Sequence, residues 1–294
     1  MRNHPHFRAY LGLVAVCFLW GTTYLGIRMA LESFPPFTLV CIRYLLSGAL
    51  MLIGSVFMKV ELPKGRELLR TSANGIVILG FGNGCLAVAE QWIPSGLAAL
   101  FVTTSPFWMV ATEAITPGGA GLHLPTILGM LVGLSGVVCL VGPGAWQQGF
   151  SGPIFAGFLV LQLGCAGWSI GSIAQRRQVT RAHPIVNGAV QQLATGVVCL
   201  IPALLVPSHP IIWKTRGVVA MLYLVFFGSI VGYSAYIYIL GKLPVPIISI
   251  YNYINPVVAV FLGWLIYREA FGIREAIAMG VIFLGVALVK RYSG

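Results

Sequence analysis

The sequence predicts an all-α integral membrane protein with ten transmembrane helices, arranged as two inverted five-helix repeats around a central cavity. Of its 294 residues, 58% are hydrophobic and the mean hydropathy is +0.90. Charged residues make up 9% of the chain, against roughly 25% in soluble domains. Apolar runs of about 20 residues, the length that crosses a bilayer, recur along the whole chain.

Ten apolar runs, separated by short connections, are expected to cross the membrane. The first run follows Arg2 and Arg8 and does not end in a small-residue cleavage site, so we expect a retained span and not a signal peptide. Several runs contain Gly or Pro, which membrane helices tolerate. The expected spans are residues 9–30, 37–58, 72–92, 95–115, 124–142, 153–174, 184–206, 217–240, 245–267 and 273–290.

The distribution of Lys and Arg predicts the orientation, because these residues concentrate in cytoplasmic loops. If the N-terminus is cytoplasmic, twelve of them fall on that side and four on the outer side. The outer four are Lys214, Arg216, Arg268 and Arg274. An even number of spans then makes both termini cytoplasmic. The net charge of +11 does not indicate a nucleic-acid partner, since the cations stand at the ends of apolar runs.

The chain carries no pattern typical of an enzyme or a metal site. It contains no Asp, its five His lie in expected loops or tails, and HExxH, GxSxG and P-loop motifs are absent. Its six Cys lie inside apolar runs without a CxxC pair, as expected for small buried hydrophobic residues. We therefore expect no catalytic residue, no metal and no cofactor.

Four sequence anchors recur at a nearly constant offset and predict an internal duplication. The pairs are 148 to 150 residues apart: Trp20 with Trp168, Pro94 with Pro244, Pro106 with Pro256, and Gly136 with Gly285. The expected halves are residues 1–145 and 146–294, with five spans each. Because five is odd, the second half enters the membrane in the opposite sense, and inverted repeats place the site where the halves meet.

Polar side chains inside the third expected span are candidates for a functional site, because such groups are costly in hydrocarbon. Gly80, Asn83, Ala87 and Glu90 share one helix face, which would suit the wall of a wet cavity. Glu90 lies near the end of its span, so solvation at the outer membrane surface is the alternative.

Two arginines lie within or at the end of expected spans. Arg28 and Arg43 could neutralise an anionic group, although we expect Arg28 to extend its charge to the outer interface. The carboxylates, among them Glu113 near the cytoplasmic end of the fourth span, offer too little negative charge to make a strongly cationic substrate the sole choice.

Aromatic residues with polar neighbours recur at helical spacing in the first, sixth, eighth and ninth spans. Together they would form a pocket for a neutral, zwitterionic or cationic organic solute. For any single ring, helix packing or an interfacial belt is the alternative. The candidates for the substrate cavity are Trp20, Tyr24, Asn83, Glu90, Trp168, Tyr233, Tyr236, Tyr251, Asn252 and Asn255.

The fifth and tenth expected spans carry glycines and few polar groups. Gly129, Gly133 and Gly136 follow one stripe, and Gly280 and Gly285 mark the last span. Small residues let helices approach closely. We expect these spans to be packing elements or a dimer face, and not cavity walls.

Several motifs resemble the drug/metabolite transporter superfamily, EamA-type branch, over nearly the whole chain. The motifs are Trp20–Gly21, Arg28, Pro36 and Arg43 at the start, IPSGLAAL (Ile93 to Leu100) followed by Pro106, and Asn255–Pro256 with Gly280 and Gly285 near the end. Gly118–Gly119 replaces the family's usual Gly-Glu pair, and Arg268 precedes Glu269 where the family has Gly. The resemblance implies ten helices in two inverted repeats and a cavity lined mainly by spans one, three, four, six, eight and nine.

The residues and the resemblance together predict a secondary exporter of small organic solutes in the bacterial inner membrane. Amino acids, aromatic or otherwise apolar, are the leading substrate class, with alternating access as the mechanism. The alternatives are efflux of drugs or hydrophobic organic cations, an integral-membrane enzyme acting on lipids, and a non-transporting scaffold. The expected partners are a small-molecule substrate and membrane lipid, and the expected state is a monomer or weak homodimer.

Overall fold

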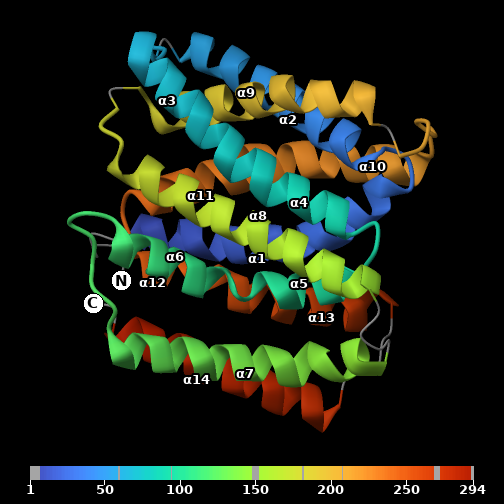
Figure 1. The fold of residues 1–294 in the computed structure, drawn as a ribbon, viewed down its shortest axis with the longest axis vertical. Coiled ribbons are helices and arrows are strands. Elements are labelled where there is room, and N and C mark those ends of the chain that lie inside the picture. The colour runs from blue at the N-terminus through green and yellow to red at the C-terminus, as the bar shows by residue number, and fades with distance from the viewer. Residues whose placement is uncertain are drawn as a thin grey trace.

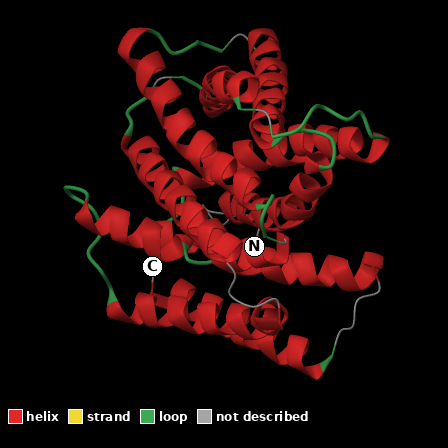
Figure 2. Ribbon diagram, turned by 45° about the vertical axis from the view of Figure 1, so that its right-hand side comes forward, coloured by secondary structure: helices red, strands yellow, loops and turns green. Residues whose placement is uncertain are grey.

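The computed structural model describes residues 7–58, 60–93, 95–147, 152–180, 182–206, 208–267 and 272–292, and their secondary structure is helical (Figure 2). The first-half helices are α1 (Phe7–Leu31), α2 (Pro36–Phe57), α3 (Gly65–Gly75), π-helical η1 (Ile76–Phe81), α4 (Gly82–Ala89), α5 (Ser95–Val102), α6 (Ser105–Ile115) and α7 (Leu124–Gln147). The second-half helices are α8 (Gly152–Arg177), α9 (Pro184–Leu205), α10 (Thr215–Tyr223), π-helical η2 (Leu224–Gly232), α11 (Tyr233–Leu240), α12 (Val245–Ser249), α13 (Tyr251–Tyr267) and α14 (Ile273–Tyr292).

Seven helical segments of the described chain are long and apolar enough to cross a membrane, which makes this a multi-pass helical membrane protein. They are Phe7–Leu31, Pro36–Phe57, Gly65–Ala89, Ala98–Ile115, Gly152–Arg177, Pro184–Leu205 and Thr215–Leu240. Two further apolar segments are shorter than these seven. They are Leu124–Cys139 within α7 and Val245–Val258 in α12 and α13. The count of ten spans stays a prediction.

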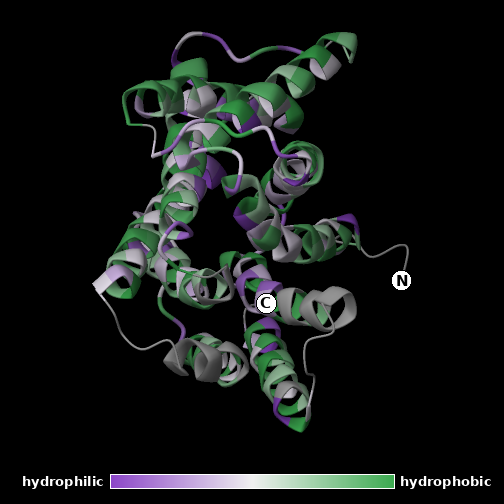
Figure 3. Ribbon diagram, turned by 90° about the vertical axis from the view of Figure 1, so that its right-hand side faces the viewer, coloured by the Kyte–Doolittle hydropathy of each residue, from purple (hydrophilic) through white to green (hydrophobic). Residues whose placement is uncertain are grey.

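Hydrophobic residues predominate along the helices, as Figure 3 shows by colour. On α1, Leu11, Val14 and Phe18 are more than half exposed and follow one another at helical spacing. Phe155 and Leu163 do the same on α8. Soluble monomers rarely expose contiguous apolar faces of this extent, so these faces are suited to hydrocarbon and not to water.

Proline starts two of the transmembrane helices. Pro36 and Pro184 occupy the first turns of α2 and α9, where the missing N–H costs nothing and the fixed φ suits a helix. His183 caps α9, since its Nδ1 accepts a hydrogen bond from the Ile185 backbone N–H at 3.3 Å. These local signals explain why both helices begin where the apolar runs begin.

The two most extensive helix pairs are α2 with α9 and α7 with α14, which lie at opposite ends of the view in Figure 1. Glycine residues allow the two helices of each pair to pack closely. A Cβ on Gly48 would lie 2.8 Å from the Leu193 backbone nitrogen, and one on Gly285 would lie 2.3 Å from the Gly133 nitrogen. The predicted glycine stripe of the fifth span thus packs against α14 within the chain.

Two transmembrane segments change from α- to π-helical geometry partway along. The π-helices η1 and η2 begin at Ile76 and Leu224, 148 residues apart, which is the offset of the Trp20 and Trp168 pair. π-helical turns are frequent at functional sites. Each π-helix carries or directly precedes residues that line the central pocket described below.

The start of α1 and the end of α14 lie at the same end of the bundle. The Lys290 ammonium stands 5.2 Å from the centre of the Tyr10 ring. The Thr126 hydroxyl at the start of α7 donates to the Tyr292 backbone oxygen at 3.2 Å. The first and last helices therefore run back to a common end, as an even number of crossings requires.

We expect Gly285→Ala to destabilise the protein by about 1–3 kcal/mol, the usual cost of overpacking. Its Cβ would also lie 2.5 Å from the Gly133 Cα, so α7 and α14 must separate. Gly280→Ala is the matched control on the same helix, because a Cβ there meets no described atom within 4 Å. Thermal melting of both variants in detergent tests the prediction, and equal melting temperatures would contradict it.

Candidate functional site

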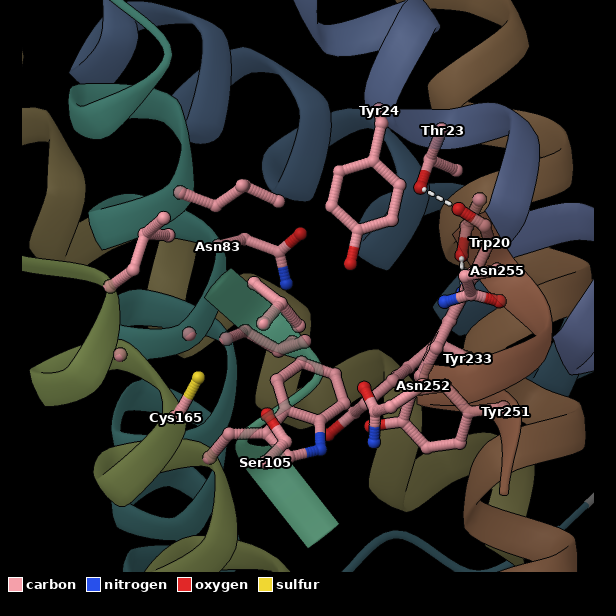
Figure 4. A pocket seen from close by; sticks show the side chains of 18 of the residues that line it. Trp20, Thr23, Tyr24, Asn83, Ser105, Cys165, Tyr233, Tyr251, Asn252 and Asn255 are labelled. Carbon is pink, nitrogen blue, oxygen red and sulfur yellow. Dashed lines mark hydrogen bonds between the residues drawn. The ribbon is translucent and has the colours of Figure 1, made fainter. Parts of the chain in front are cut away.

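A central pocket lies among helices from both halves of the chain. Its walls come from α1, α2, η1, α4, α5 and α6 of the first half and from α8, η2, α11 and α13 of the second half. About 690 Å³ of space lies between these walls, counting the open solvent at its mouth. Eight of the ten predicted cavity residues line it: Trp20, Tyr24, Asn83, Trp168, Tyr233, Tyr251, Asn252 and Asn255. Figure 4 shows Tyr24 and Asn83 entering the space from different helices.

Aromatic rings centred on Trp20 form one wall of the pocket. The Trp20 ring centre lies 5.2 Å from that of Trp168 and 5.1 Å from that of Tyr251, both in edge-to-face geometry. Such pairs contribute about 0.5–1.5 kcal/mol each beyond the area they bury. Trp20 Nε1 donates to the Gly228 backbone oxygen in η2 at 3.1 Å. The two tryptophans that sequence analysis pairs across the halves thus meet at the centre of the molecule.

Tyr236 lies behind this wall and does not line the pocket. Its hydroxyl accepts a hydrogen bond from Trp168 Nε1 at 3.0 Å and lies 2.7 Å from the Ser172 hydroxyl. The Tyr236 side chain is fully buried. It therefore holds the Trp168 ring in place, a positioning role that differs from the direct contact expected from the sequence.

Three asparagine side chains, those of Asn83, Asn252 and Asn255, add hydrogen-bonding groups to the pocket wall. Asn252 donates to the Ser249 backbone oxygen at 3.2 Å, and its buried Oδ1 accepts from none of the described residues. The Asn255 amide, oriented to satisfy its neighbours, donates to the backbone oxygens of Tyr251 and Cys17 at 3.0 Å each. Asn252 is thus the amide with a free acceptor at the pocket wall.

Glu90, the carboxylate predicted to line the cavity, does not line the pocket. It follows α4 and is 1% exposed, and neither carboxylate oxygen has a hydrogen-bond partner in the described chain. Arg28 donates to the backbone oxygens of Glu90 and Ile93 at 3.0 and 3.3 Å. Of the predicted face in this span, Asn83 lines the pocket, whereas Gly80, Ala87 and Glu90 do not.

Arg43 in α2 lines the pocket and was not among the ten candidates. It is 4% exposed, and its Nε donates to the Ser229 hydroxyl at 2.7 Å. Its guanidinium carbon lies 5.1 Å from the centre of the Tyr44 ring, which also lines the pocket. An arginine inside an apolar run was the available signal, but sequence alone does not say towards which neighbour it turns.

A second, more polar pocket lies beyond the central one, among α3, α8, α9 and α11. It encloses about 590 Å³ by the same measure, and Gln175, Arg176 and Gln191 line it. The Tyr233 hydroxyl, at the wall of the central pocket, donates to Gln191 Oε1 at 2.7 Å. Gln191 Nε2 in turn donates to Gln175 Oε1 at 2.5 Å. This chain of hydrogen bonds connects the wall of the central pocket to the lining of the second pocket.

A helical membrane bundle around a central pocket with an aromatic wall is suited to moving a solute across the membrane. Comparison with known proteins agrees: the chain matches the EamA-like transporter family twice, over residues 7–142 and 155–291. It belongs to that family. The two matches fall on the two halves in which the sequence anchors recur.

Individual relatives agree with this assignment. The inner membrane transporter YedA of Escherichia coli (strain K12), described as uncharacterized, is 34% identical over 94% of this chain and 89% of its own length. An uncharacterized transporter of Archaeoglobus fulgidus is 25% identical, with 96% of each chain covered. A solved crystal structure shares the fold with a TM-score of 0.79, covering 97% of this chain and 98% of its own at 24% identity.

We expect Tyr236→Phe to destabilise the protein by about 1–3 kcal/mol, because it leaves the buried Trp168 N–H without its acceptor. Tyr238→Phe is the matched control, since Tyr238 is on the same helix and 37% exposed. Thermal unfolding followed by tryptophan fluorescence provides the measurement. A Tyr236→Phe variant as stable as Tyr238→Phe would refute the positioning role.

Proposed function

We propose that this protein is a secondary transporter that exports small organic solutes across the bacterial inner membrane by alternating access. Amino acids with aromatic or other apolar side chains are the leading substrate class. The observation that carries the proposal is the central pocket, where rings such as Trp20 and Tyr251 stand beside the amides of Asn252 and Asn255. Rings bind an apolar side chain, and amides bind its polar groups.

The ten-span, inverted-repeat arrangement is part of the proposal. It is supported by the twofold family match, by the common offset of the π-helices and the tryptophan pair, and by the ends of α1 and α14 lying together. The repeats are residues 1–145 and 146–294. The bias of Lys and Arg towards one side supports cytoplasmic termini.

Alternating access needs a closure on each side of the substrate. We assign one of them to the Tyr233–Gln191–Gln175 chain, because it connects the wall of the central pocket to the lining of the polar second pocket. In this proposal the second pocket is the cytoplasmic vestibule, and these bonds break when the halves rock about the centre.

Efflux of hydrophobic organic cations is the second candidate. The aromatic wall favours it, since ring faces attract cations. The charge of the pocket disfavours it, because Arg43 lines the wall and none of the described lining residues is acidic. Amino acids therefore remain the leading class.

Vesicles containing the purified protein should take up labelled amino acids with apolar side chains faster than empty vesicles do. Trp20→Ala should slow this uptake about tenfold, since it removes a ring of the pocket wall, and an aromatic contact with the solute contributes about 0.5–1.5 kcal/mol. Phe18→Ala, on the same helix but 54% exposed on the outer face, should leave the rate unchanged.

The panel should also include a labelled lipophilic cation. If no amino acid moves faster than in empty vesicles, the amino-acid proposal is wrong, and movement of the cation alone would select the second candidate. Melting temperatures of both variants separate loss of transport from loss of folding.

Gln191→Ala should weaken the closure between the two pockets. Cys165, which lines the central pocket, should then react faster with a hydrophilic maleimide, while Cys139, exposed on α7, should react at an unchanged rate. Mass spectrometry of the two Cys peptides over time measures both rates in one sample. Unchanged labelling of Cys165 would show that Gln191 does not close the pocket.

A further inference from the structure

Arg43 is a buried positive charge that stands at a pocket without an acidic partner. It is 4% exposed, and no described Asp or Glu oxygen lies within 4 Å of its guanidinium nitrogens. A charge removed from water is costly unless it is paired and hydrogen-bonded. The cost is greater inside a membrane protein, where such residues mark substrate and ion pathways.

The neighbours of Arg43 satisfy only part of its guanidinium. Nε donates to Ser229 at 2.7 Å, and Nη1 reaches Asn83 Oδ1 at the long distance of 3.5 Å. Nη2 donates to no residue in the part of the chain that the structure describes. Since Arg43 lines the pocket, its unused donor capacity is available there.

Glycine at position 228 lets η2 pass close to this end of the guanidinium. Gly228, the residue before Ser229 in η2, would place a Cβ 2.9 Å from Arg43 Nη2. Because Ser229 accepts from Nε and Gly228 lies beside Nη2, η2 holds this edge of the planar guanidinium and fixes its plane. A guanidinium held by one edge is prepared to receive a carboxylate at its free edge.

We propose that Arg43 binds the carboxylate of the transported solute, and so restricts the substrate to small organic molecules with a free carboxylate beside an apolar group. This assignment rests on the proposed transport function and deepens it. The same pairing neutralises the buried charge, so substrate binding supplies the partner that the protein itself lacks.

The ammonium group of an amino acid also has a suitable partner in the pocket wall. Asn252 lines the pocket, and its buried Oδ1 has no described donor, which leaves an acceptor for an ammonium group beside the pocket. The faces of the surrounding rings add cation–π attraction. Because these interactions are weaker than a charge-assisted guanidinium–carboxylate pair, the carboxylate is the required group and the ammonium contributes less.

Competition binding on the purified wild-type protein tests the assignment directly. Labelled L-phenylalanine is the probe, and the competitors are L-phenylalanine, 3-phenylpropionate, L-phenylalaninamide and 2-phenylethylamine. The first two retain the carboxylate, and the last two lack it. We expect the compounds without a carboxylate to compete about 10- to 100-fold more weakly, the range of a charge-assisted hydrogen bond.

Variants at two arginines locate the effect. Arg43→Gln should lose the preference for the carboxylate, so that L-phenylalanine and L-phenylalaninamide compete equally. Arg43→Lys should retain part of this preference. Arg28→Gln is the matched control, since Arg28 donates to backbone oxygens near Glu90 and does not line the pocket. It should keep the wild-type preference.

If Arg43 had only a structural role, Arg43→Gln would lower the melting temperature. It would not change the ratio between the affinities for L-phenylalanine and L-phenylalaninamide. If Arg43→Gln fails to fold, the wild-type competition series and Arg43→Lys still decide. If L-phenylalanine and L-phenylalaninamide compete equally for the wild-type protein, the proposed role of Arg43 is wrong, and the transport proposal still stands. Failure of every amino acid and analogue to bind the wild type would reject the proposed function, and the assignment with it.

Discussion

The structure depends on one constraint, which is that backbone groups in hydrocarbon must find their hydrogen-bond partners within the protein. α-Helices meet this requirement along their length. Within the π-helical η2, the Gly228 backbone oxygen accepts a hydrogen bond from the Trp20 indole. Irregular backbone is tolerated at membrane depth where it lines a cavity. The place where the helix ladder changes is therefore also the place where a pocket can form.

The centre of the molecule is shared between the halves. Trp20 and Trp168 hold equivalent sequence positions and touch each other at the pocket, with Tyr236 fixing the second of them. The pairs α2 with α9 and α7 with α14 pack closely through glycine on either flank. The two closely packed helix pairs thus lie on either side of a centre that contains the aromatic pocket, and the outer faces of the helices remain apolar.

Charge is used sparingly, and the two buried charged side chains have different surroundings. Arg43 lines the pocket and donates to Ser229. Glu90 lies outside the pocket lining, and Arg28 donates to its backbone oxygen. The described pocket lining thus carries a cation and no anion. This polarity, together with the aromatic wall, is the physical ground on which we propose a carboxylate-bearing solute in preference to an organic cation.

Hydropathy and spacing in the sequence were enough to predict a helical membrane protein and eight residues of the pocket wall. These are local properties, since a span must be about 20 apolar residues long and a face repeats every three or four residues. The tertiary structure decided which way each face turns. It brought Arg43 to the pocket and left Glu90 and Tyr236 out of its lining, because the rotation of a helix about its own axis is set by the neighbours against which it packs.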